Sequence, residues 1–256
     1  MNKLSKYKVK KFTLIDNARD SLNHAVDHLT KEKLLLGDLK CALRDVSHVV
    51  ELLIKERLYR VHPAFVWQNV DKYPRDEENT VGVQQAVERL SKIAGLILKS
   101  DEIMVINRCK KIRNEIEHYE FILDEKEVKV IIGKVLSFII SFSIKHLSVD
   151  FENEFKSDDR WKTLLDLYEF WEAHSKSVRD DLESKNIPYC ECPSCYADTF
   201  NLAIDQCALC GHIEQEVECE KCGDSVWESN SETLEFEDGD FDSGRSFSAN
   251  LTSKAT

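Results

Sequence analysis

A chain of 256 residues is long enough for one sizeable core and a second, smaller module. Hydrophobic residues make up 42% of it and charged residues 32%, and the presence of only 8 Gly and 4 Pro argues against an all-β fold with its many turns. The longest apolar stretch, 128–147, is interrupted by lysines, so the sequence predicts no membrane span.

The formal net charge of −12 falls in the C-terminal quarter of the chain. Residues 188–256 contain 15 Asp+Glu and 3 Lys+Arg, whereas residues 1–187 contain 32 of each kind. Such a tail does not favour electrostatic binding of nucleic acid. It is typical of a solubilising segment or of a segment that binds a basic protein partner. Residues 1–11 carry five lysines but no apolar signal core, so we expect a basic N-terminal arm and a cytoplasmic protein.

The first two-thirds of the chain has the periodicity of amphipathic helices. Apolar residues such as Leu14 and Leu22 recur at helical spacing over 13–31, and a second helix is expected from Asp38, a candidate N-cap, to just before Pro63. After a long loop, the sequence predicts four more helices, at 80–97 with Thr80 as cap, at 101–121 with Asp101 as cap, at 125–147 and at 158–183.

The predicted helix 125–147 is apolar on most of its faces. A helix of this kind belongs either in the centre of a core or in an oligomer interface. We therefore expect it to contribute to one of the two, and it motivates the prediction of a homodimer.

Six cysteines near the C-terminus form three CxxC pairs: Cys192 and Cys195, Cys207 and Cys210, Cys219 and Cys222. Clustered pairs in a chain without a secretion signal indicate metal binding rather than disulfides. Two pairs supply the four thiolates of a structural Zn²⁺ site, and the arrangement resembles a zinc ribbon.

The pairing of these cysteines leaves alternatives. We favour Cys192, Cys195, Cys207 and Cys210 as the primary site; the third pair would then complete a second site with Cys190 and His212, or it would replace the first pair. An all-thiolate site has no open position, so we expect a structural rather than a catalytic zinc. The ribbon either stabilises the fold alone or also recruits a protein or RNA.

The segment 113–119 contains the candidate catalytic residues. Asn114 and His118 are four positions apart and share one helix face, and the long side chain of Arg113 reaches toward that face. Arginine, asparagine and histidine together can bind a phosphate and transfer protons near neutral pH. A short motif of this kind also occurs on ordinary solvated helix faces.

This segment resembles the Arg-x4-6-His motif of HEPN domains, in which a polar residue follows the arginine. The resemblance covers about residues 12–147 and includes the segments 17–29, 48–58, 62–72 and 113–121. It implies an antiparallel helical bundle that dimerises and brings two Arg/His motifs into one cleft. In catalytic members the pair cuts RNA without metal, in defence or toxin-like roles.

By this resemblance, His118 would act as general acid or base, Arg113 would stabilise the charge on phosphorus, and Asn114 would orient groups. The expected organisation is an all-α, HEPN-like domain over 12–186, a zinc-ribbon β module over 187–228 and an acidic disordered tail over 229–256. The leading hypothesis is a homodimeric, metal-independent endoribonuclease. The alternative is a non-catalytic dimerisation scaffold that binds partners through the ribbon or the tail.

Two further groups of polar residues lie on the predicted helices. His48, Glu51 and Lys55 share one face and could line the same cleft, but we favour an ordinary ion pair between Glu51 and Lys55. His24 and His28 are four apart, and we expect them on a helix surface rather than in a metal site.

Overall fold

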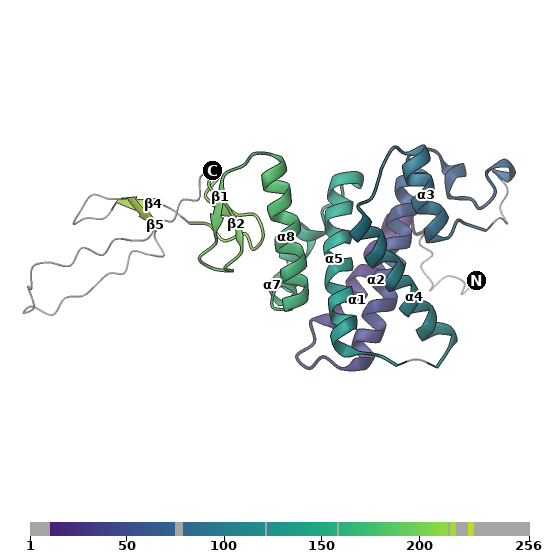
Figure 1. Cartoon of the computed structure of the whole chain (residues 1–256), viewed down its shortest axis with the longest axis horizontal. Coiled ribbons are helices and arrows are strands. Elements are labelled where there is room, and N and C mark those ends of the chain that lie inside the picture. The colour runs from purple at the N-terminus through teal and green to yellow at the C-terminus, as the bar shows by residue number, and fades with distance from the viewer. Residues whose placement is uncertain are drawn as a thin grey trace, which may run out of the picture. The chain divides into compact units, whose positions relative to one another are not determined.

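The computed structural model describes residues 11–74, 79–120, 122–157, 159–214, 216–218 and 225–227. Over these residues the protein is mostly helical and has a small antiparallel sheet (Figure 1). The described residues form eight α-helices, and four cysteines cluster beside the sheet. The chain divides after Ile213 into two compact units. No helix in the described ranges is long and apolar enough to cross a membrane.

Local capping explains where the first helix begins. In α1 (Leu14–Leu29), the Thr13 hydroxyl accepts the Asp16 N–H at 3.1 Å, and the Asp16 carboxylate accepts the Thr13 N–H at 3.2 Å. The second helix, α2 (Leu36–Tyr59), begins before the predicted cap. Asp38 lies in its first turn, where its carboxylate accepts the Leu35 N–H at 3.2 Å.

The segment between α2 and α4 contains short elements: η1 (Pro63–Val66), η2 (Val70–Lys72) and α3 (Val83–Ile93). Thr80 is not the cap of α3, because it pairs with Trp67 in an isolated β-bridge and Gly82 takes the cap position. The helix with the Arg/His motif, α4 (Ser100–His118), likewise begins one residue before Asp101.

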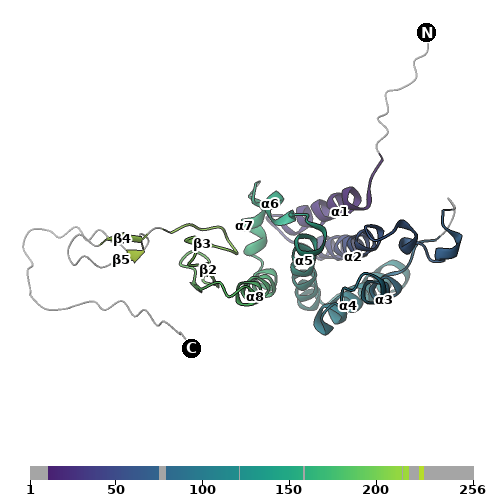
Figure 2. The ribbon, with the colours of Figure 1, turned by 90° about the horizontal axis from the view of Figure 1, so that it is seen from above.

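The long apolar helix α5 (Glu125–Leu147) has the bounds that the sequence predicts. Asp124 caps it by accepting the Glu127 N–H at 2.8 Å. The helix lies between α2, α4 and α8 and is buried along most of its length (Figure 2). Of the two alternatives for this helix, the structure therefore supports the core.

The predicted helix 158–183 is broken in the structure. After α6 (Phe151–Lys156), it forms α7 (Arg160–Leu165) and α8 (Tyr168–Ser184), with Leu167 in an extended conformation between them. The break turns Trp161 and Phe170 toward each other, with ring centroids 5.5 Å apart, and both are buried. It also brings the backbone of Glu169 against Gly133 on α5.

Three short antiparallel strands follow α8 in the order β1 (Tyr189–Glu191), β2 (Asp198–Asn201) and β3 (Gln206–Cys207). This sheet packs on the helices: Trp161 Nε1 donates to the Leu209 carbonyl at 2.9 Å, and Arg179 pairs with Asp198 at 3.2 Å. The second unit contains an antiparallel pair, β4 (Glu216–Glu218) and β5 (Ser225–Trp227).

Candidate functional site

Four cysteine thiols converge at the end of the three-stranded sheet. The Sγ atoms of Cys192, Cys195, Cys207 and Cys210 all lie within 4.8 Å of one another. Two of the Sγ–Sγ distances, from Cys192 to Cys210 and from Cys195 to Cys207, are 3.7 Å. Tetrahedral zinc with Zn–S bonds of about 2.3 Å places its sulfurs about 3.8 Å apart. The cluster could therefore hold a metal ion, and these are the four residues that the sequence favours for the primary site.

The two cysteine pairs share one local conformation. The N–H of Tyr196 donates to the Cys192 carbonyl at 2.9 Å, and the N–H of Gly211 donates to the Cys207 carbonyl at 3.0 Å. Both residues have positive φ, 59° at Tyr196 and 81° at Gly211. A glycine adopts this conformation without strain, which explains the one that follows the second pair.

The thiols of this cluster are coupled to one another by hydrogen bonds. The contact between Cys195 and Cys207 lowers the pKa of Cys207 far below its usual range and raises that of Cys195. The third predicted pair, Cys219 and Cys222, lies outside the described residues, as do most of the basic arm and the acidic tail.

The Arg/His motif lies in the last turns of α4, a separate part of the helical domain. Arg113 and Asn114 are half-buried, and Arg113 Nη1 donates to Asn114 Oδ1 at 3.3 Å. The imidazole of His118 has 65% of its surface exposed. The structure thus places the three predicted catalytic residues on one accessible end of a helix.

Glu117, which the sequence did not indicate as a site residue, contacts two residues of this motif. Its Oε1 lies 2.9 Å from Arg113 Nε, and its Oε2 lies 3.9 Å from His118 Nε2. The spacing of four residues between Arg113 and Glu117 gives the first contact, and adjacency in the chain gives the second. The arginine and the histidine can therefore reach one and the same anionic group.

Buried residues of α4 pack against α2. Cys109 is buried there, and burial raises the pKa of its thiol to about 12, against the smaller influence of Ser47 and of the Arg113 charge. A thiol of this kind is inert at neutral pH. Cys109 therefore holds the helix in place and is no candidate nucleophile.

The ion pair that the sequence predicts on the polar face of α2 is present in the structure. Lys55 Nζ lies 2.5 Å from Glu51 Oε1, and it also donates to Thr80 Oγ1 at 2.8 Å. The Lys55 side chain is buried, so it ties the segment at Thr80 to the core. The ion pair between Glu51 and Lys55 is confirmed, and it has a structural role.

The two histidines of α1 have partners that the sequence could not reveal. His24 Nδ1 lies 2.5 Å from Asp45 Oδ2, and His28 Nδ1 lies 2.8 Å from Asp38 Oδ1. Both aspartates come from α2, so the pairs depend on the packing of the two helices. Lys31 also contacts Asp38, at 2.5 Å, which places a cation beside the histidine and disfavours a metal there.

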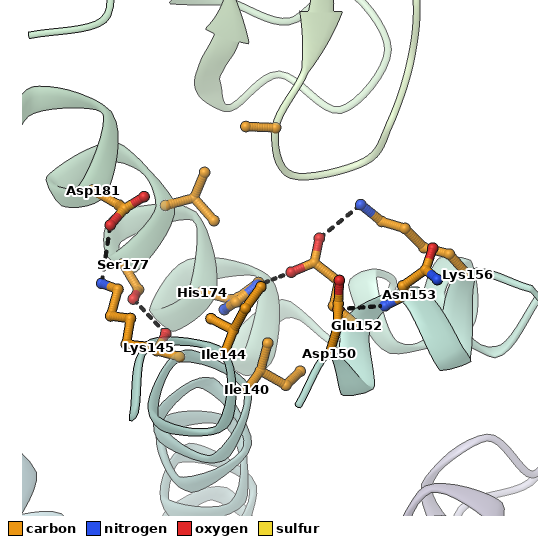
Figure 3. A pocket seen from close by; sticks show the side chains of 13 residues that line it. Ile140, Ile144, Lys145, Asp150, Glu152, Asn153, Lys156, His174, Ser177 and Asp181 are labelled. Carbon is orange, nitrogen blue, oxygen red and sulfur yellow. Dashed lines mark hydrogen bonds and ion pairs between the residues drawn. The ribbon is translucent and has the colours of Figure 1, made fainter. Parts of the chain in front are cut away.

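A pocket of about 300 Å³ lies between α5, α6, α8 and the cysteine module (Figure 3). Its charged side chains pair with one another: Lys145 lies 3.2 Å from Asp181, and Lys156 lies 2.7 Å from Glu152. The buried His174 lies 3.5 Å from Glu152 and stacks on Phe170. The pair of Lys145 and Asp181 joins α5 to α8, and the pair of His174 and Glu152 joins α8 to α6. Nε2 of His174 is buried and makes no hydrogen bond to the described residues.

The chain matches no protein-family model, no curated protein and no solved structure to which it was compared. These comparisons therefore assign the chain to no family. The α4 motif and the cysteine cluster are the two features of the described residues that point to a function.

Proposed function

We propose that the chain is a metal-independent endoribonuclease of the HEPN type that acts as a homodimer. The observation that supports this proposal is the contact of one carboxylate, that of Glu117, with both Arg113 and His118. An RNA phosphate at the same place would meet a guanidinium that can stabilise its charge and an imidazole that can transfer a proton.

The reaction uses the hydroxyl next to the scissile phosphate. The 2′-hydroxyl loses its proton to a general base and attacks the adjacent phosphorus, and the 5′-oxygen leaves with a proton from a general acid. His118 and its copy in the second subunit serve as base and acid, and Arg113 stabilises the charge that develops on the phosphoryl oxygens. Asn114, which accepts from Arg113, orients the guanidinium. The products carry a 2′,3′-cyclic phosphate and a free 5′-hydroxyl.

The test is cleavage of total RNA by the full-length protein in EDTA over short times. Wild type should cut, whereas His118→Ala and Arg113→Ala should each lose about 10²-fold or more in rate, because residues that act as one unit fail together. Asn114→Ala should lose less. His24→Ala, which removes an exposed histidine on α1, is the control and should cut like wild type.

Two results would defeat the proposal. Equal cutting by wild type and His118→Ala would show that the motif does not catalyse the reaction. Activity that stops at once in EDTA and returns with magnesium would show that the chemistry depends on a metal.

We further propose that the metal of the cysteine cluster is zinc with a structural role. The Sγ–Sγ distances of 3.7 Å support it, because they fit tetrahedral sulfur coordination and leave no position for a substrate. The cluster and the α4 motif share no residue, so RNA cleavage does not require zinc chemistry.

A second candidate function is a non-catalytic scaffold whose cysteine module recruits a partner. Large apolar side chains on this module are exposed, namely those of Tyr196, Ile204 and Ile213. Exposed apolar side chains of this size are available for contact with a protein partner. RNA cleavage that depends on His118 would decide for the enzyme, and an RNA-inactive protein that loses a bound partner on Ile204→Ser would decide for the scaffold.

A further inference from the structure

The carboxylate of Glu117 offers its two oxygens to the two residues that carry the proposed chemistry. Oε1 faces Arg113 Nε at 2.9 Å and Oε2 faces His118 Nε2 at 3.9 Å. All three residues belong to α4, so the arrangement needs no other part of the chain. Guanidinium groups recognise carboxylate and phosphate oxygens with the same donor geometry.

We propose that Glu117 is a built-in competitor for the substrate phosphate, and that RNA must displace its carboxylate before Arg113 can act. The inference rests on the proposed function and concerns the regulation of that same site. It assigns Glu117 a negative role, so that removal of its charge should strengthen RNA binding and raise the rate of cleavage.

Electrostatics sets the size and sign of this effect. The Nε edge of Arg113 can pair with the carboxylate or with a phosphate, and two anions close together repel each other. The competition is weak enough to be overcome, because an ion pair between residues four apart on an exposed helix contributes little stability. RNA that makes further contacts with the protein displaces the Glu117 carboxylate from Arg113. A free phosphate or a short fragment gains too little binding free energy to displace it.

The chain contains a matched control for this role. Glu115 lies on the same helix, carries the same charge and also pairs with a residue four positions before it, Lys111, at 3.9 Å. Its side chain is 41% exposed, against 25% for Glu117. Glu115→Gln therefore makes the same change in net charge near the motif without releasing Arg113.

The test measures binding of a 2′-O-methyl oligoribonucleotide, which lacks the attacking hydroxyl and is not cut. Fluorescence anisotropy at one fixed salt concentration compares full-length wild type, Glu117→Gln and Glu115→Gln. Glu117→Gln should lower Kd by about three- to tenfold, and Glu115→Gln by less than about twofold. On cleavable RNA, kcat/KM should rise in the same proportion in Glu117→Gln alone.

Unchanged or weaker binding by a Glu117→Gln protein that melts like wild type would overturn the inference. If Glu117→Gln does not fold, Glu117→Asp replaces it, because aspartate keeps the charge but is too short to reach Arg113. Glu117→Asp should also bind the oligoribonucleotide more tightly than wild type. Equal or weaker binding by Glu117→Asp would overturn the inference. Tighter binding without any cleavage would defeat only the ribonuclease. Cleavage that needs His118, together with unchanged binding, would defeat only the role of Glu117.

Discussion

The cysteine thiols lie too far apart for disulfides and at the distance that a tetrahedral metal requires. A disulfide needs sulfurs about 2.05 Å apart, whereas the pairs in the cluster are 3.7 Å apart. We predict that the purified protein holds one zinc ion in this cluster and that Cys195→Ser loses it. The sheet should then unfold, because structural zinc sites of this size contribute about 10 kcal/mol or more to folding. Elemental analysis and circular dichroism measure the two effects.

Cys190→Ser is the control for this change. Cys190 lies on β1 next to the cluster, but its thiol faces the Glu191 carbonyl at 3.5 Å. The control should keep the zinc of the four-cysteine cluster, and the far-ultraviolet helical signal should persist in both variants because the helices form a hydrophobic core from their own residues. An equal loss of metal in both variants would contradict the assignment of the four ligands.

The groupings of residues that the sequence predicts correctly are those between residues close together in the chain. The four clustered cysteines are recognisable because two CxxC pairs by themselves nearly complete a site, and Asn114 and His118 because helical spacing puts them on one face. The partners of His24 and His28 come from another helix, and no spacing within α1 reveals them. The contact of Glu117 with two motif residues depends on side-chain conformation, which the sequence does not specify.

At the scale of elements, the sequence wrongly predicts one continuous helix over 158–183. The ends of the two helices that form there depend on packing against other parts of the chain. The start of α5 follows from a cap at Asp124, a local signal. No Gly or Pro lies at the break between α7 and α8, so the sequence does not predict it. The break brings α8 so close to α5 that a Cβ on Gly133 would lie 2.5 Å from the Glu169 carbonyl oxygen, and no pattern within the segment 158–183 reveals this contact.

This close approach predicts that Gly133→Ala destabilises the protein. The methyl group would collide with the backbone at Glu169 and Phe170, and backbone atoms cannot rotate away as the end of a side chain can. Overpacking of this kind costs about 1–3 kcal/mol, which more than offsets the higher helix propensity of alanine. Urea unfolding followed by circular dichroism measures the loss.

Gly37→Ala provides the comparison. Gly37 lies in the first turn of α2, and a Cβ there would meet nothing within 4 Å. Alanine should therefore leave stability unchanged or raise it by up to about 1 kcal/mol. Destabilisation of the same size in both variants would show that the helix contact at Gly133 is not the cause.

At the scale of the whole molecule, the reason for expecting a dimer changes. The apolar surface of α5 is covered within the chain by α2, α4 and α8, so this helix does not call for a partner subunit. Large apolar side chains are instead exposed on and near α4, at Ile97, Met104, Tyr119 and Ile122. Met104 and His118 lie on the same side of α4, about four turns apart. A second copy seated on this side would bring its motif toward the first.

We therefore predict a homodimer that involves the exposed side of α4. Met104 has 64% of its surface exposed, and Met104→Glu would place a charge in the interface, raising the dissociation constant about tenfold or more. Sedimentation velocity at micromolar concentration measures this, and RNA cleavage should fall together with the dimer fraction because the proposed site needs two motifs. Tyr168→Glu, at an equally exposed position at the start of α8, should change neither quantity. A wild-type protein that stays monomeric and still cuts RNA would rule out the two-motif site. If Met104→Glu and Tyr168→Glu weakened the dimer equally, the interface would not be on the exposed side of α4.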